Sequence, residues 1–191
     1  MHPSSPTDGD LLRLMIAGSE DAFGVLYERW SPSVYRFALH MSADQHIAEE
    51  VTQDTFMMLV RRPAMFDDTR GALVSWLLGI ARNLTRRALC ATRDATWDES
   101  RDDEGLDNAE DPAAPTDVLT DLTRRETIEA VRQAVLSLPP AYREVVVLCD
   151  LQEMDYRDAA VALDCPVGTV RSRLHRARTM LMTKLHTRCL A

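Results

Sequence analysis

The stretch YRDAAVALDCPVGTVRSRLHRARTML, residues 156–181, decides the fold of the second half of this chain. Its first eight residues predict a short helix that Asp155 caps, and the small residues Ala159 and Ala160 suit a close helix crossing. The Asp-Cys-Pro sequence at 164–166 ends that helix, and a longer one follows. A helix, a tight turn and a second helix are the pattern of a helix-turn-helix DNA-binding unit.

The longer helix is amphipathic. Its apolar residues recur every three or four positions and must face a core: Val167, Val170, Leu174, Ala177, Leu181 and Leu185. The opposite side carries Thr169, Ser172, His175, Arg176 and Thr179, flanked by Arg171, Arg173 and Arg178. The centre of this face can reach base edges, and its flanks can reach phosphates. A membrane surface or an acidic protein is the alternative partner for such a basic helix.

The charge of the chain is unevenly distributed. The formal net charge is -8 over 191 residues, yet residues 166–191 contain six Lys or Arg and no acidic residue. Residues 81–93 contain four arginines and no acidic residue. Residues 94–121 hold eleven acidic residues against Arg101 alone, a net charge of -10. Two basic segments therefore flank one acidic connector.

The connector has two prolines, few apolar residues and high charge, a composition typical of a chain that cannot bury enough surface to fold. It predicts a flexible acidic linker at 94–116 between an N-terminal domain at 8–93 and a C-terminal domain at 117–188. An acidic surface loop within one domain is the alternative interpretation. The C-terminal domain begins with a helix from Val118 to Leu138, and a second helix follows at 142–151.

The N-terminal segment predicts four helices, enough to close a small bundle. A helix near Leu11 is followed by one over 22–39, where Pro32 predicts a kink or break near Ser31. A third helix is expected at 44–61 and a fourth at 71–93. The whole chain is therefore expected to be all-α.

The third and fourth predicted helices each offer a polar face. In the third, Glu49, Glu50, Gln53 and Asp54 form an acidic ridge, which alone is typical of a solvated face. In the fourth, Ser75, Arg82, Arg86 and Arg93 are expected opposite the apolar stripe, with Asn83 and Arg87 beside them. Basic residues near Trp76 suit a phosphate backbone and stacked bases, although arginines on a helix also serve solubility.

Several function classes lack support in the sequence. The longest aliphatic stretch, near residues 145–149, is far shorter than the roughly 20 residues of a membrane helix, and no signal peptide is apparent. A cytoplasmic protein without membrane insertion is expected. The four cysteines, Cys90, Cys149, Cys165 and Cys189, form no metal-binding pattern, so buried reduced thiols are expected and a redox role stays open. No nucleophile with a base, phosphate loop or metal cluster is visible, so we expect no enzyme, no metal and no cofactor.

Three segments together resemble the extracytoplasmic-function (ECF) sigma factors. They are AEEVTQDTF at 48–56, FDDTRGALVSWLLGIARN at 66–83, and LPPAYREVVVLCDLQEMDYRDAAVALDCPVGTVRSRLHRARTML at 138–181. They occur in the order and spacing of that family and cover most of the chain outside the acidic linker. The resemblance implies a two-domain helical initiation factor that binds bacterial RNA polymerase core and directs it to promoters.

The resemblance also implies where the partners bind. The acidic ridge would bind the clamp of the largest polymerase subunit through Glu50, Gln53 and Asp54, with Phe56 as a supporting residue. The flap of the second subunit and an anti-sigma factor are the other protein partners expected. This implication changes the interpretation of the ridge from a solvated face to a partner surface.

The same resemblance assigns the two promoter elements. The -10 element would be opened and read by Phe66, Asp67, Asp68, Thr69, Arg70, Arg82, Asn83 and Arg86. The -35 element would be read as duplex by Thr169, Arg171, Ser172, Arg173, His175, Arg176 and Arg178. Arg176 is the expected guanine contact, because its guanidinium fork matches guanine O6 and N7. An autonomous DNA-binding regulator that uses only the C-terminal helices is the competing hypothesis.

Two positions depart from the pattern of many relatives. Asp164 stands in the turn where glycine is common, and aspartate tolerates the left-handed conformation less comfortably than glycine. Cys165 replaces the usual aliphatic residue. The turn is nevertheless expected to form.

Overall fold

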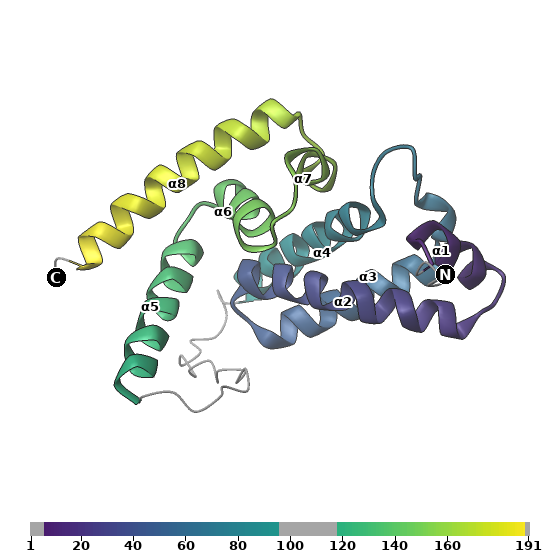
Figure 1. The fold of residues 1–191 in the computed structure, drawn as a ribbon, viewed down its shortest axis with the longest axis horizontal. Coiled ribbons are helices and arrows are strands. Elements are labelled where there is room, and N and C mark those ends of the chain that lie inside the picture. Colours follow the sequence, from purple (N-terminus) through teal and green to yellow (C-terminus); the bar gives the residue numbers. More distant parts are fainter. Residues whose placement is uncertain (1–5, 96–117, 190–191) are drawn as a thin grey trace, which may run out of the picture.

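The computed structural model describes residues 6–95 and 118–189, and within those ranges it contains helices and no strands. Figure 1 shows two groups of helices in contact. The first group contains α1 (Asp8–Ile16), α2 (Glu20–Ser42), α3 (Gln45–Arg61), the 3-10 turn η1 (Pro63–Met65) and α4 (Leu73–Ala95). The second contains α5 (Val118–Leu136), α6 (Pro140–Val146), the π-helical turn η2 (Val147–Leu151), α7 (Tyr156–Leu163) and α8 (Val167–Cys189).

The prediction of an all-α fold is confirmed for the described residues. The acidic linker predicted at 94–116 lies outside them, apart from its first two positions, which belong to α4. Side-chain caps begin the first three helices: Thr7, Ser19 and Asp44 each accept a hydrogen bond from a backbone N–H of the first turn. These caps satisfy donors that the helix itself leaves unpaired.

Helix α2 narrows one prediction. It continues through Pro32, so of the two outcomes expected near Ser31, a kink or a break, the break does not occur. Proline removes one backbone hydrogen bond from a helix interior. Leu26 before it and Val34 and Phe37 after it are fully buried, so core packing holds both halves of the helix in place.

The second group follows the predicted helix-turn-helix pattern. Asp155 caps α7 by accepting two hydrogen bonds, at 2.6 and 2.9 Å, from backbone N–H groups of its first turn. Asp164 ends α7 in the left-handed conformation, with φ 49° and ψ 52°. The helix expected at 142–151 begins earlier, at Pro140, and its last turn widens into the π-helical η2.

The two groups share one hydrophobic core. A continuous cluster of buried apolar side chains joins Leu77 of α4, Val145 of α6 and Leu163 of α7, and it extends into α2, α3 and α8. The glycines of α4 and the preceding loop permit a close approach between the groups. A Cβ atom added at Gly79 would lie 3.3 Å from the carbonyl oxygen of Ala162, so a larger residue there would force the helices apart.

Polar side chains reinforce this contact. The guanidinium of Arg143 donates a 2.7 Å hydrogen bond to the carbonyl of Met41 at the end of α2. The amide of Gln152 donates a 3.0 Å hydrogen bond to the carbonyl of Ser33. Both donors belong to the second group and both acceptors to the first. The described part of the chain has no helix with the length and hydropathy needed to cross a bilayer.

Candidate nucleic-acid and polymerase interfaces

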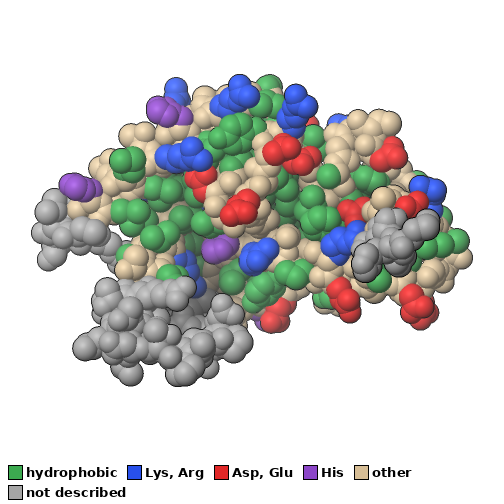
Figure 2. All heavy atoms as spheres, in the orientation of Figure 1, with side chains coloured by type: hydrophobic (Ala, Val, Ile, Leu, Met, Phe, Trp, Pro, Cys, Tyr) green, Lys and Arg blue, Asp and Glu red, His purple; other side chains and the backbone are tan. Residues whose placement is uncertain are grey.

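Helix α8 presents a basic face over a buried apolar stripe. Val170, Leu174 and Ala177 are at most 2 % exposed, which confirms the centre of the predicted inward side, and Val167, Leu181 and Leu185 are half-buried. Of the residues predicted to read the -35 element, Arg171, Ser172, His175, Arg176 and Arg178 are exposed, and Thr169 and Arg173 are half-buried. Figure 2 shows Lys and Arg side chains along the edge where α8 lies in Figure 1. The seven residues therefore lie on one helix and in reach of solvent.

Two arginines of α8 already have partners within the chain. Arg178 donates from Nε and Nη2 to the two carboxylate oxygens of Asp150, at 3.1 and 2.6 Å. The pair raises the pKa of Arg178 above its usual value, chiefly through the hydrogen bond to Asp150. The guanidinium of Arg171 lies 5.9 Å from the ring centroid of Tyr156, a cation–π distance.

Helix α4 differs from its prediction. Ser75 and Arg82 are expected to face solvent, but Ser75 is fully buried and the Arg82 side chain is only 17 % exposed. The cause is a second buried face, on which Ser75, Leu78 and Gly79 lie at helical spacing with Arg82. Gly79 approaches Ala162 of α7, and Arg82 approaches Glu144 of α6. A single apolar stripe does not describe a helix that is covered on two sides.

Arg82 forms an ion pair across the contact between the two groups. Its Nε lies 2.9 Å from Oε1 of Glu144 on α6, and the Glu144 side chain is 3 % exposed. The Nε atom of Arg82 has no hydrogen-bond partner among the described residues, so the interaction is mainly electrostatic. Asn83 and Arg86, the other predicted -10 residues of α4, are exposed.

The loop before α4 is exposed at Asp67, Asp68, Thr69 and Arg70, all predicted to contact the -10 element. Within it, Oδ1 of Asp67 accepts hydrogen bonds from the backbone N–H and hydroxyl of Thr69, at 3.0 and 2.6 Å. These bonds hold the pKa of Asp67 below its usual value. Phe66 is half-buried, with its ring centroid 5.9 Å from that of Trp76.

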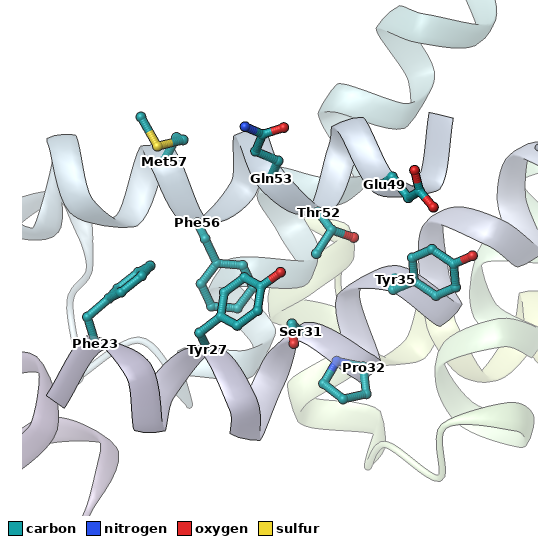
Figure 3. Close-up of a pocket in the computed structure, with 10 residues that line it drawn as sticks. All are labelled: Phe23, Tyr27, Ser31, Pro32, Tyr35, Glu49, Thr52, Gln53, Phe56 and Met57. Atoms are coloured by element: carbon teal, nitrogen blue, oxygen red, sulfur yellow. The ribbon is translucent and has the colours of Figure 1, made fainter. Parts of the chain in front are cut away.

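A groove of about 620 Å³ runs between α2 and α3. Figure 3 shows Phe56 pointing from α3 toward Tyr27 of α2, and the two ring centroids are 4.8 Å apart. Phe23 and Tyr35 of α2 and Gln53 of α3 also line the groove. These aromatic residues of α2 were not among the predicted polymerase contacts, although Phe23 and Tyr27 stand one helical turn apart.

The four predicted polymerase contacts do not form one continuous patch. Gln53 and Phe56 belong to the α2–α3 groove, where Phe56 is only 2 % exposed and supports the groove from below. Glu50 and Asp54 instead line a smaller recess of about 250 Å³, opposite Arg87 of α4. Glu50, Gln53 and Asp54 are all exposed.

Glu144, Asp150 and Tyr156 are the contact residues that the sequence analysis missed. Glu144 stands just before an apolar run, where an acidic residue predicts either a cap or a buried pair. Asp150 ends the same run. Glu144 and Asp150 each pair with an arginine that is distant in the sequence. Sequence periodicity therefore could not predict either pair.

The cysteines and acidic residues give no sign of metal or thiol chemistry in the described segments. No group of three His, Cys, Asp or Glu side chains there is arranged to hold a metal ion. Burial, with a smaller contribution from Asp150, raises the pKa of the Cys149 thiol to about 11. That thiol is therefore protonated at neutral pH. Cys90 is exposed and Cys165 is half-buried.

Comparisons with known proteins match both groups of helices. Residues 26–94 match the family model for sigma-70 region 2, and residues 128–181 match sigma-70 region 4. The ECF RNA polymerase sigma factor SigW of Bacillus subtilis is 32% identical over 174 residues, covering 88% of this chain and 91% of SigW. SigE of Mycolicibacterium smegmatis, also named an ECF sigma factor, is 33% identical over 156 residues, covering 82% of this chain but 58% of SigE.

The fold also has solved counterparts. The Bartonella quintana sigma factor RpoE, in a co-crystal structure with the anti-sigma factor NepR, superposes with a TM-score of 0.67. The alignment is 24% identical and covers 86% of this chain and 96% of that one. This likeness concerns the arrangement of helices.

Proposed function

The chain belongs to the ECF sigma factors, which direct RNA polymerase to promoters, and from this premise we propose which of its surfaces bind polymerase and promoter DNA. The observation that carries the proposal is the basic face of α8, which is exposed opposite the buried side chains of Val170, Leu174 and Ala177. Such a face fits a major groove, where side chains can reach base edges while the opposite side of the helix stays packed.

We assign the -35 element to α8. Ser172, His175 and Arg176 lie at the centre of its exposed face, and Arg176 has no ion pair with any described residue. The guanidinium of Arg176 is therefore available for two hydrogen bonds to guanine O6 and N7. Arg171 and Arg173 flank this centre and suit phosphate contacts, with Thr169 at the start of the helix.

The -10 element is assigned to the loop before α4 and to the exposed part of α4. Thr69, Arg70, Asn83 and Arg86 are accessible as the chain stands. Phe66 and Trp76 offer neighbouring aromatic rings for stacking an unpaired base. Arg82 can join this surface only when its contact with Glu144 opens.

Polymerase core binding is assigned to α3 and the groove beside it. Gln53 at the groove, with Glu50 and Asp54 on the next faces of α3, would bind the clamp of the largest subunit. Phe56 would support that surface from beneath. The second group of helices would bind the flap of the second subunit, and an anti-sigma factor would compete for the same surfaces.

Both promoter elements can be occupied only after the two groups separate. The names -10 and -35 place the elements about 25 base pairs apart, which is about 85 Å along B-DNA. In this structure α4 packs directly against α7. The proposed units at 8–93 and 117–188 are joined by a linker that could span about 75 Å if fully extended. We propose that polymerase binding in the cytoplasm stabilises the separated form.

The test is run-off transcription with RNA polymerase core and genomic DNA fragments. We expect the wild-type chain to yield promoter-dependent transcripts and to copurify with core polymerase, and Asp54→Lys to lose both. His46→Gln, an exposed change near the start of the same helix, serves as the matched control. Tight operator binding without polymerase and full activity of Asp54→Lys would instead support the autonomous regulator.

A further inference from the structure

The turn between α6 and α7 contacts the recognition face of α8 at two points. Asp150 binds Arg178 through both carboxylate oxygens, at 2.6 and 3.1 Å. Tyr156, at the first position of α7, lies under the guanidinium of Arg171 at 5.9 Å and also contributes to the raised pKa of Arg178. Arg171 and Arg178 stand seven residues apart, which is about two helical turns. Two successive turns of α8 are therefore attached to one short segment.

This segment is itself firmly held. The backbone N–H of Met154 donates to the carbonyl of Leu148 at 3.0 Å, and that of Gln152 donates to Val147 at 3.1 Å. Asp155 caps α7 directly before Tyr156. The backbone at Asp150 and Tyr156 is therefore held in place. Their side chains can anchor another helix only because of this.

The carboxylate of Asp150 is unfavourable for DNA binding by itself. A carboxylate beside a phosphate backbone is repulsive, and it cancels most of the charge that Arg178 would bring to that backbone. The bidentate geometry is instead suited to fixing orientation, because two parallel hydrogen bonds restrain both the position and the rotation of the guanidinium.

We propose that Asp150 and Tyr156 are positioning residues for -35 recognition: they hold Arg178 and Arg171 and thereby fix the rotation of α8 about its axis. Arg178 acts through Asp150 rather than as a simple phosphate contact. Ser172, His175 and Arg176 lie between the two anchored arginines, so their direction toward the base edges depends on both anchors. The inference deepens the proposed function and rests on the assignment of the -35 element to α8.

The proposal and a phosphate role for Arg178 predict different results for one substitution. If Arg178 were a phosphate contact, Asp150→Asn would free its charge and strengthen promoter binding. If Asp150 positions α8, Asp150→Asn lowers the ratio of matched to mismatched -35 binding. We expect that ratio to fall about tenfold, comparable to the loss of one good base contact.

The experiment uses the full chain with core polymerase and a genomic fragment that yields a discrete run-off transcript. Binding is measured on this fragment and on copies with single base changes in the -35 element, for Asp150→Asn, Arg178→Gln and the double variant. For a positioning pair, the double variant loses no more discrimination than either single one. The slope of the logarithm of the binding constant against the logarithm of salt concentration should be unchanged in Arg178→Gln. Loss of a phosphate contact would reduce the size of this slope by about one.

Glu129→Gln is the matched control, because it removes the carboxylate partner of Arg132 on α5, away from α8. We expect it to leave the ratio unchanged. Core polymerase binding and circular dichroism should be unchanged in every variant, which separates positioning from general stability. Stronger binding by Asp150→Asn, an unchanged ratio, or a salt slope reduced by one in Arg178→Gln would overturn the inference. Absence of any transcript with the wild-type chain would overturn the proposed function itself.

Discussion

Helices α4 and α8 both carry an arginine paired with a carboxylate, and the two pairs are placed in opposite ways. Arg82 of α4 reaches Glu144 across the contact between the two helix groups, with side chains only 17 % and 3 % exposed. Arg178 of α8 reaches Asp150 within its own group, with side chains 54 % and 26 % exposed. The basic face of α8 thus stays open to solvent, while part of the corresponding face of α4 is covered.

The difference shows that burial decides whether an ion pair mainly affects stability or mainly affects geometry. Removing one partner from a buried pair leaves a charge without solvation and is strongly destabilising. An exposed pair contributes little to stability, so its main effect is on geometry. The Arg82 pair should therefore govern the contact between the groups, and the Arg178 pair should govern the orientation of α8.

The largest expected effect comes from Glu144→Ala, which leaves Arg82 without its partner. We expect the free energy of unfolding to fall by about 3 kcal/mol, in the range for one lost partner of a buried pair. Urea unfolding of the full chain measures this change. Glu129→Ala, which removes an exposed partner of Arg132, should change it by less than about 0.5 kcal/mol. Equal effects for the two variants would mean that burial does not distinguish the pairs.

The second prediction separates base reading from phosphate contact on α8. Arg176→Ala should weaken holoenzyme binding to the matched -35 element by about 1 to 3 kcal/mol while affecting mismatched elements much less. Arg173→Ala removes a flanking arginine that is not one of the two anchored ones, so it should weaken binding nearly uniformly and flatten its salt dependence. Binding titrations at several salt concentrations distinguish them. Equal losses for Arg176→Ala on matched and mismatched DNA would remove its base-reading role.

The smallest expected effect concerns pH at the contact between the groups. Burial, and then the positive charges of Arg132 and Arg36, lower the pKa of His40 below its usual 6.5. The unfolded chain therefore binds this proton more readily, so the contribution of neutral His40 is complete above about pH 6.5 and is lost as pH falls below it.

The measurement is urea unfolding of the wild-type chain and of His40→Gln, at about pH 7.5 and about pH 5.5. Stability should fall on acidification more in the wild-type chain than in the variant. Parallel losses in the two proteins would assign the pH dependence to other groups.

The features that depend on local periodicity and capping could be predicted from the sequence. The inward stripe of α8, the cap at Asp155 and the left-handed end of α7 at Asp164 all follow from short-range rules, and the structure confirms them. These features need no knowledge of the rest of the chain. The recognition helix was therefore the most predictable part of the candidate site.

The prediction failed where a second surface covers a helix. The apolar stripe of α4 placed Ser75 and Arg82 opposite the core, yet α6 and α7 bury that side as well. Leu78 and Gly79 were the available signal, since one is apolar and the other small on the supposedly exposed face. The partners of Arg82 and Arg178 depend on contacts between distant segments, which periodicity does not encode.

The shared core has a further consequence for thermodynamics. Buried side chains of α4, α6 and α7 belong to one continuous cluster, although residues 96–117 separate α4 from the other two helices in the sequence. Exposing the core of one group therefore exposes part of the other, which couples their melting. The free chain should behave as one cooperative unit with a single heat-capacity peak, whereas separation of the groups on polymerase would divide that unit in two.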